Sequence, residues 1–317
     1  MSFRFLDLPA ARDDLRADVL AGLAAHPKSI PPKYFYDAPG CRLFESICKQ
    51  PEYAVTRTEH ALMATHLPEI AQVIGKMDCI IEPGAGDCSK VRALLDALHP
   101  SQLIVLDIGG SALAQAAEPL ARDYPQLDVT AIGMDFIHEL DAASPHITAG
   151  RRLVYYPGSS IGNFSPAEAA TVLTRFRHLA GEAGQLLIGF DLKKDPQQLH
   201  QAYNDAAGIT AAFNLNLLQR LNRELGANFD LAQFRHYAFY TPQAGRIEMH
   251  LVSLAEQTAT ISDQTFHFDL GESVHTENSY KYRCDEFSLI ANKAGWKLTR
   301  EWEQDGFAVQ LYGQGSA

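Results

Sequence analysis

Short apolar runs and helical patterns alternate through the middle of the chain. The apolar runs lie at 78–86, 102–110, 127–136, 151–164 and 184–192. Apolar residues at helical spacing follow the first, second and fourth of these runs. Runs of this length are typical of buried strands, and buried strands that alternate with helices indicate a parallel sheet built from βαβ units. We therefore predict an α/β domain around a parallel sheet.

Two helix starts carry capping signals. Thr56 and Glu59 have the spacing of a capping box, which predicts a helix that runs to about Val73. Ser165 followed by Pro166 predicts a second helix, directly after the fourth apolar run.

The alternation stops at about residue 193 and resumes near residue 282. Between them, helical patterns at 197–208 and 209–225 precede strand patterns at 246–254 and 265–270. The chain then closes with a helical stretch at 285–296 and two strands, at 296–304 and 307–313. A terminal pair of strands resembles the end of class I methyltransferase sheets, in which the last strand inserts antiparallel. Ordinary dinucleotide-binding folds lack it.

These patterns together predict two domains. The first is an α/β, Rossmann-like class I S-adenosylmethionine-dependent methyltransferase sheet, formed by residues 58–192 and 282–317. The second is an inserted α+β substrate-binding domain, formed by residues 1–57 and 193–281. We expect a substrate cleft between them, over the carboxyl ends of the parallel strands.

Composition narrows the choice of partner. The 317-residue chain has a formal net charge of −11 and no dense run of Lys and Arg, which argues against a nucleic-acid partner. No apolar run approaches the roughly 20 residues that span a bilayer, and acidic residues near the N-terminus disfavour a signal peptide. The five cysteines are widely spaced, and neither CxxC nor HExxH occurs. We expect a cytoplasmic protein without a metal and without a membrane partner.

A glycine loop follows the first predicted strand. Gly84 and Gly86 stand where a backbone must approach a ligand closely, in front of a helix N-terminus. Ser89 occupies the position of the third glycine in the nicotinamide dinucleotide fingerprint, which disfavours an oxidoreductase. By residue type alone, Lys90 is a surface lysine.

Polar residues end the next three strands. Asp107 stands 21 residues after Gly86, where an acid accepts hydrogen bonds from ribose hydroxyls. Asp135 is placed to bond an adenine amino group, and Phe136 to pack on the ring. Asn163 lies in the loop after the fourth strand, which in this fold reaches the transferred methyl group.

Ten segments in order resemble one family, the histidine-specific Nα-methyltransferases of ergothioneine biosynthesis. They are PPKYFYD (31–37), QPEYAVTRTE (50–59), the ExGxG (82–86), GMDF (133–136), GSSIGNF (158–164), GFDLKKD (189–195), AYNDAAGITAAFN (202–214), LNRELGANFD (221–230), RIEMHL (246–251) and HTENSYKYR (275–283). The resemblance runs nearly end to end. It implies a monomer that uses S-adenosylmethionine to methylate the α-amine of free L-histidine three times, which gives the betaine hercynine.

The resemblance also implies roles for residues that matching motifs place. Asn163 and Tyr203 match residues that hold the substrate α-carboxylate, and Tyr36 matches one near the reacting amine. The residues that match the cofactor site are Gly84, Gly86, Lys90, Asp107, Asp135 and Phe136.

A second set of matching residues concerns the imidazole end of the substrate. Glu277 and Ser279 match the pair that binds the imidazole, and Tyr53, Phe213 and Met249 match residues that line the pocket. Neutral imidazole has one N–H and one lone pair, so an acceptor and a donor suit it. A site built around such bonds rejects a side chain that lacks them.

Methyl transfer from a sulfonium requires a neutral, aligned amine. Positioning supplies most of the rate advantage, and the nearby sulfonium charge lowers the pKa of the amine. Tyr36, directly or through a water, is the candidate for relaying the proton.

Three alternatives remain at this stage. The chain could methylate another amino acid or amine, act as a nicotinamide-dependent oxidoreductase, or bind S-adenosylmethionine as a non-catalytic sensor. The matched imidazole residues argue against the first, Ser89 and the terminal strands against the second, and the complete amino-acid site against the third.

Overall fold

The computed structural model describes residues 2–8, 15–137, 139–147 and 150–314. The chain divides into two compact units. The first unit comprises residues 1–13, 55–193 and 282–317, and the second comprises residues 14–54 and 194–281. Among the described helices, none combines the length and the apolar character that a membrane crossing requires.

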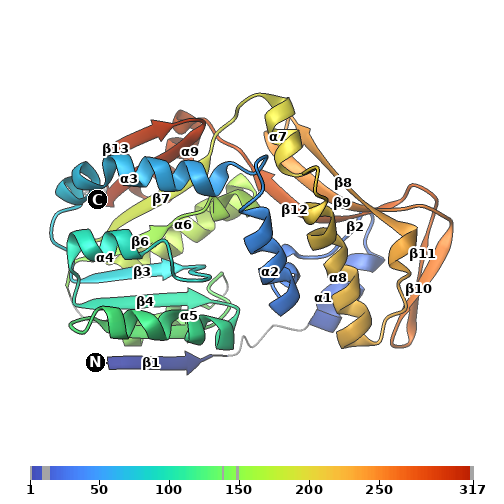
Figure 1. The fold of residues 1–317 in the computed structure, drawn as a ribbon, viewed down its shortest axis with the longest axis horizontal. Coiled ribbons are helices and arrows are strands. Elements are labelled where there is room, and N and C mark those ends of the chain that lie inside the picture. The colour runs from blue at the N-terminus through green and yellow to red at the C-terminus, as the bar shows by residue number, and fades with distance from the viewer. Residues whose placement is uncertain (1, 9–14, 138, 148–149, 315–317) are drawn as a thin grey trace. The chain divides into compact units, whose positions relative to one another are not determined.

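The first unit is built on an eight-stranded sheet (Figure 1). In spatial order its strands are β1 (Ser2–Asp7), β5 (Asp128–Gly133), β4 (Gln102–Asp107), β3 (Cys79–Pro83), β6 (Arg152–Tyr156), β7 (Gln185–Asp191), β14 (Phe307–Gln314) and β13 (Trp296–Gln304). Neighbours from β1 to β7 are parallel, whereas β14 is antiparallel to both β7 and β13. The antiparallel insertion of the last strand confirms the predicted class I methyltransferase sheet.

Helices cover both faces of this sheet because its central strands are apolar on both sides. The helices are α3 (Val55–Ile74), α4 (Arg92–Leu98), α5 (Gly110–Asp123), α6 (Pro166–Ala180) and α9 (Cys284–Lys293). Helix α3 packs on α4, and α6 packs on α9 (Figure 1). Ser165 caps α6 in a capping box with Glu168, as predicted for this helix start.

The prediction that residues 1–57 belong wholly to the second domain is wrong at the N-terminus. Strand β1 pairs with β5 along its full length and so extends the sheet of the first unit. Its side chains are mostly exposed or half-buried. Backbone pairing at a sheet edge leaves no apolar pattern in the sequence, so nothing in residues 2–7 revealed the partner.

The second unit contains a four-stranded sheet, a hairpin and helices. The sheet has the order β2 (Lys28–Ser29), β12 (Ser273–Tyr280), β9 (Arg246–Ser253) and β8 (Phe234–Thr241), and the hairpin joins β10 (Gln257–Ile261) to β11 (Gln264–Phe268). The helices are α1 (Leu15–Ala24), α2 (Ala38–Ile47), α7 (Pro196–Ala202) and α8 (Ile209–Leu225). Helix α8 packs against β8, β9 and α2.

Candidate functional site

The glycine loop follows β3 at the carboxyl edge of the first unit's sheet. Gly84 and Gly86 have φ values of +67° and +53°, which side chains with a Cβ rarely adopt. A Cβ on Gly84 would lie 3.6 Å from the ring of Phe136, whereas a Cβ on Gly86 would meet nothing within 4 Å. The loop therefore presents bare backbone, with open space in front of Gly86.

Asp107 holds this loop from the end of the neighbouring strand, β4. One carboxylate oxygen accepts from the Gly86 N–H at 3.0 Å, and the other accepts from the Gly109 N–H at 2.9 Å. A carboxylate has about four lone-pair positions, so capacity remains for ribose hydroxyls. At the end of β5, Asp135 is buried and accepts from the Ile137 N–H at 3.0 Å. The acids predicted at the cofactor edge therefore follow adjacent strands.

Glu82 lies near the end of β3, directly before the glycine loop, and is buried. Within the described residues, its Oε2 atom has no hydrogen-bond partner. Burial raises the pKa of this carboxyl well above its usual value, although Lys90 opposes the effect. A ligand that brings a positive charge or an N–H donor would relieve this cost, and S-adenosylmethionine carries both an ammonium and a sulfonium. The residues at this edge therefore fit that ligand.

The capping-box interpretation of Glu59 is wrong. Helix α3 begins at Val55, and the Glu59 side chain is buried instead of closing on the helix start. Its two carboxylate oxygens accept from Lys90 Nζ and from the Gly158 N–H, both at 2.7 Å. A buried carboxylate needs such partners, and they come from the segment after the glycine loop and the loop after β6. Lys90 is thus anchored beside the predicted cofactor edge.

The loop after β6 leads into a short 3-10 helix, Ser160–Asn163. Ser159 has a φ of +60°, a strained value for a residue other than glycine, and its Oγ accepts from the Asp191 N–H at 2.9 Å. Asn163 is half-buried, and its side chain forms no hydrogen bond with any described residue. Both the donor and the acceptor of its amide therefore remain for a ligand.

Aromatic side chains from both chain segments of the second unit form a connected cluster. The Tyr36 ring lies 5.9 Å from that of Phe213 and 5.8 Å from that of Phe44. Phe44 continues to Tyr53 at 6.5 Å, and Tyr53 to Tyr203 at 6.1 Å. Four residues predicted for the substrate pocket are therefore brought together. Phe44 of α2 joins them and was missed, because one apolar residue on a short helix carries no distinguishing signal.

A β-bulge in β12 decides which side chains face this cluster. The register between β12 and β9 shifts between His275 and Glu277. His275 pairs with His250 before the shift, and Glu277 pairs with the buried Met249 after it. The extra residue reverses the alternation, so Glu277 and Ser279 lie on the buried face of the sheet.

Glu277 is a buried carboxyl that has no hydrogen bond with any described residue. Burial raises its pKa to about 7, against the opposing effect of Lys281. A buried carboxyl favours a hydrogen-bond donor, and none of the described residues supplies one, so the position of Glu277 suits a ligand that does.

Ser279 lies two residues further along β12 and belongs to a closed network. Its Oγ accepts from the Tyr203 hydroxyl at 2.7 Å and from Lys281 Nζ at 2.9 Å. Lys281 Nζ also donates to the Tyr203 hydroxyl at 3.0 Å. Lys281 is 1% exposed and was not among the predicted residues. Its charge suggested the surface, and only the packing reveals that it is buried.

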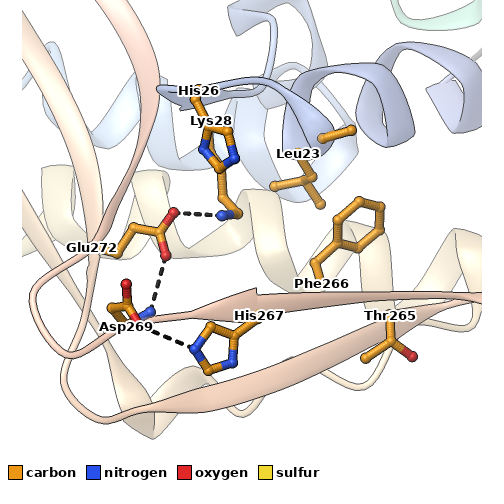
Figure 2. A pocket seen from close by; sticks show the side chains of 9 residues that line it. Leu23, His26, Lys28, Thr265, Phe266, His267, Asp269 and Glu272 are labelled. Atoms are coloured by element: carbon orange, nitrogen blue, oxygen red, sulfur yellow. Dashed lines mark hydrogen bonds and ion pairs between the residues drawn. The ribbon is translucent and has the colours of Figure 1, made fainter.

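A separate hollow of about 530 Å³ lies elsewhere in the second unit (Figure 2). It is lined by Leu23, Ala24, His26, Lys28, Thr265, Phe266, His267, Asp269 and Glu272. No predicted site residue is in this set. Its charged groups bond one another: Lys28 pairs with Glu272, and His267 pairs with Asp269 (Figure 2). We therefore assign no ligand to it.

One group of metal-ligand side chains lies on the opposite face of the β9–β12 sheet from Glu277. Glu248, His250 and His275 have ligand atoms within 4.8 Å of one another. Each is already hydrogen-bonded within the chain, Glu248 to Arg246 at 2.7 Å and His275 to Asn278 at 3.0 Å. The expectation that the protein works without a metal stays a prediction.

Comparison with known proteins identifies a matching family model and several similar proteins. A family model described as histidine-specific methyltransferase, SAM-dependent, matches residues 15–313. The chain is 40% identical over 304 residues to histidine N-alpha-methyltransferase of Mycolicibacterium smegmatis, and 38% identical over 305 residues to that of Mycobacterium tuberculosis. Each alignment covers 94% of both chains. Ergothioneine biosynthesis protein 1 of Neurospora crassa is 28% identical over 87% of this chain and 32% of its own length.

Proposed function

Because this chain belongs to the family of SAM-dependent, histidine-specific methyltransferases, we propose that it transfers methyl groups from S-adenosylmethionine to the α-amine of free L-histidine. Three successive transfers give hercynine and three molecules of S-adenosylhomocysteine. The names of the relatives from Mycolicibacterium smegmatis and Mycobacterium tuberculosis support histidine as the substrate. The relative from Neurospora crassa supports a place in ergothioneine biosynthesis.

The observation that carries this proposal is the pair of unfilled hydrogen-bonding positions on β12. Glu277 offers a buried acceptor with no partner among the described residues. Ser279 accepts two hydrogen bonds and donates its own proton to no described group. Neutral imidazole needs one acceptor and one donor, which these two residues supply. Phenylalanine would leave both unpaired, so the pocket rejects it.

At the cofactor edge, S-adenosylmethionine supplies an electrophilic methyl group on a sulfonium. Gly84 and Gly86 let the backbone approach the ligand, and Asp107 accepts from its ribose hydroxyls. Asp135 and Phe136 bind and cover the adenine. Lys90, held by Glu59, completes this set.

The remaining residues bind and orient the amino acid. Asn163 and Tyr203 take the contacts to the α-carboxylate that the family resemblance implies. Tyr203 donates to the carboxylate only by giving up its bond to Ser279, and Lys281 then remains as the donor to Ser279. Tyr53, Phe213 and Met249 are the apolar walls.

Each transfer needs a neutral amine, so one proton must leave the protonated amine before each of the three methyl groups is added. The Tyr36 hydroxyl is the group that we assign to this relay, directly or through a water. The proposal further includes a monomer in the cytoplasm that works without metal, nucleic acid or membrane.

Mass spectrometry tests the function directly. The purified protein is incubated with S-adenosylmethionine and a mixture of all free amino acids. We expect stepwise gain of one, two and three methyl groups on histidine alone. Methylation of a different amino acid would overturn the assignment of Glu277 and Ser279. Cofactor binding without any methylation would favour a sensor.

A further inference from the structure

We infer that Lys281 is a positioning residue for substrate recognition: through its bond to Ser279, it turns the serine hydroxyl into a fixed donor for the unprotonated ring nitrogen of histidine. This inference rests on the proposed function, because it concerns the same imidazole site.

The first step is the distribution of protons in the network. A serine hydroxyl has one proton to donate and two lone pairs. Ser279 Oγ accepts from Lys281 Nζ at 2.9 Å and from the Tyr203 hydroxyl at 2.7 Å. An ammonium has no lone pair, so the serine proton has no acceptor on Lys281. That proton is therefore directed away from the network.

The second step concerns the burial of Lys281. A lysine is almost never fully buried without partners, and this side chain is 1% exposed. Its ammonium lies 5.1 Å from the centre of the Tyr203 ring, and its backbone N–H donates to the Gly245 carbonyl at 2.8 Å. These contacts come from separate segments of the second unit, so the position of the ammonium is determined by packing.

The third step is the consequence for the ligand. A buried hydroxyl with a free rotor suits a donor or an acceptor. When Tyr203 turns to the substrate carboxylate, Lys281 still donates to Ser279, so the serine proton still points away from the lysine and suits an acceptor. Ser279 therefore selects a ligand atom with a lone pair, while Glu277 on the same face selects an N–H. The lysine thus determines which edge of the ring each residue binds.

The test compares Lys281→Met, Ser279→Ala and the double variant by steady-state kinetics with L-histidine. We expect Lys281→Met to lower kcat/KM for histidine by about 10- to 100-fold, mainly through KM, and to leave KM for S-adenosylmethionine unchanged. Because the lysine acts through the serine, the double variant should be no worse than the worse single variant. Lys281→Gln, which retains an N–H donor, should recover part of the loss.

Lys28→Met is the matched control. Lys28 is also buried and ion-paired in the second unit, with Glu272, and its ammonium lies over the ring of Phe268, which is not a predicted site residue. It should lower thermal stability without changing KM for histidine. If Lys281→Met does not fold, the same comparison is made with Lys281→Gln, whose KM for histidine should exceed that of the wild type.

Two results would overturn the inference while histidine methylation by the wild type stands. One is an unchanged KM for histidine in the lysine variants, and the other is multiplication of the two single effects in the double variant. Absence of histidine methylation in the wild type is a different result, because it overturns the proposed function itself.

Discussion

The two units of this protein present their functional groups in different ways. In the first unit, the candidate residues follow β3, β4, β5 and β6, and the topology of a parallel sheet brings them to one edge. In the second unit, they come from the segments on either side of α2, from the end of α7, from α8, and from β9 and β12, and side-chain contacts between these elements bring them together. A site determined by topology can be found from strand patterns, whereas one determined by packing cannot.

Among the described residues, each unit has a buried carboxyl whose pKa is raised by burial, and the charges around the two carboxyls differ. Around Glu82, burial is reinforced by the neighbouring acids Asp87, Glu59 and Asp107. Around Glu277, burial acts without other acids, and Lys281 opposes it. The first arrangement favours a cationic ligand, and the second favours a neutral N–H donor.

The largest expected effect on activity concerns the substrate site of the second unit. Glu277→Ala should lower kcat/KM for histidine by about 1,000-fold, because it removes the acceptor for the imidazole N–H from a buried position. Binding of S-adenosylmethionine, measured by calorimetry, should be unchanged. Asn278→Ala is the control from the same strand, since Asn278 faces the opposite side of the sheet. Equal losses in the two variants would show that the loss does not depend on which face of the sheet the substituted side chain occupies.

Protein stability gives a second test of Glu277. Since burial raises the pKa of Glu277 from an ordinary 4.5 to about 7, the folded protein binds more protons than the unfolded chain between these pH values. Stability therefore falls as pH rises through this window, and the cost is complete above pH 7. Glu277→Gln should be more stable than the wild type by about 3 kcal/mol at pH 8 and equal to it at pH 4.

Urea denaturation across this pH range measures that difference. The free energy of unfolding of the variant should change less between pH 4 and pH 8 than that of the wild type. A variant that is less stable at pH 8 would mean that the carboxylate is satisfied in the free protein, which would contradict its availability to a ligand.

A smaller effect is expected at Glu59 in the first unit. Glu59→Gln should lower the free energy of unfolding by about 2 kcal/mol, because it breaks a buried ion pair with Lys90. Glu168 is the matched control, since it closes a capping box with Ser165. Glutamine serves equally well in that position, so Glu168→Gln should change little. Equal, small effects would restore the capping role for Glu59.

Strand patterns sufficed to predict the sheet and the acids at its edge, and the resemblance of the terminal strand pair to class I methyltransferase sheets predicted the antiparallel last strand. They did not reveal β1, because an edge strand pairs through its backbone. Nor did they reveal the role of Glu59, because its spacing from Thr56 matches a capping box while its partners lie about 30 and 100 positions further along the chain.

In the second unit, the residues of the pocket were predicted from the family resemblance and not from periodicity. The bulge at His275 and Glu277 defeats a simple alternation, since it places residues of the same parity on different faces. Phe44 and Lys281 were missed for a related reason. An apolar residue and a lysine acquire their roles from contacts between distant segments, which no local pattern records.

The smallest expected effect concerns the loop after β6 in the first unit. It shows whether the conformation of this loop depends on the sheet or on the helix that follows it. Ser165→Ala removes the side-chain cap of α6 and should lower the free energy of unfolding by about 1 kcal/mol. The loop itself is held by bonds that do not involve Ser165, from Gly158 to Glu59 and from Asp191 to Ser159. KM for S-adenosylmethionine and for histidine should therefore stay close to the wild-type values, since the substitution leaves both of these bonds in place. A clear rise in either KM would mean that the start of α6 positions Asn163. The site of the first unit would then depend on local packing, as the site of the second unit does.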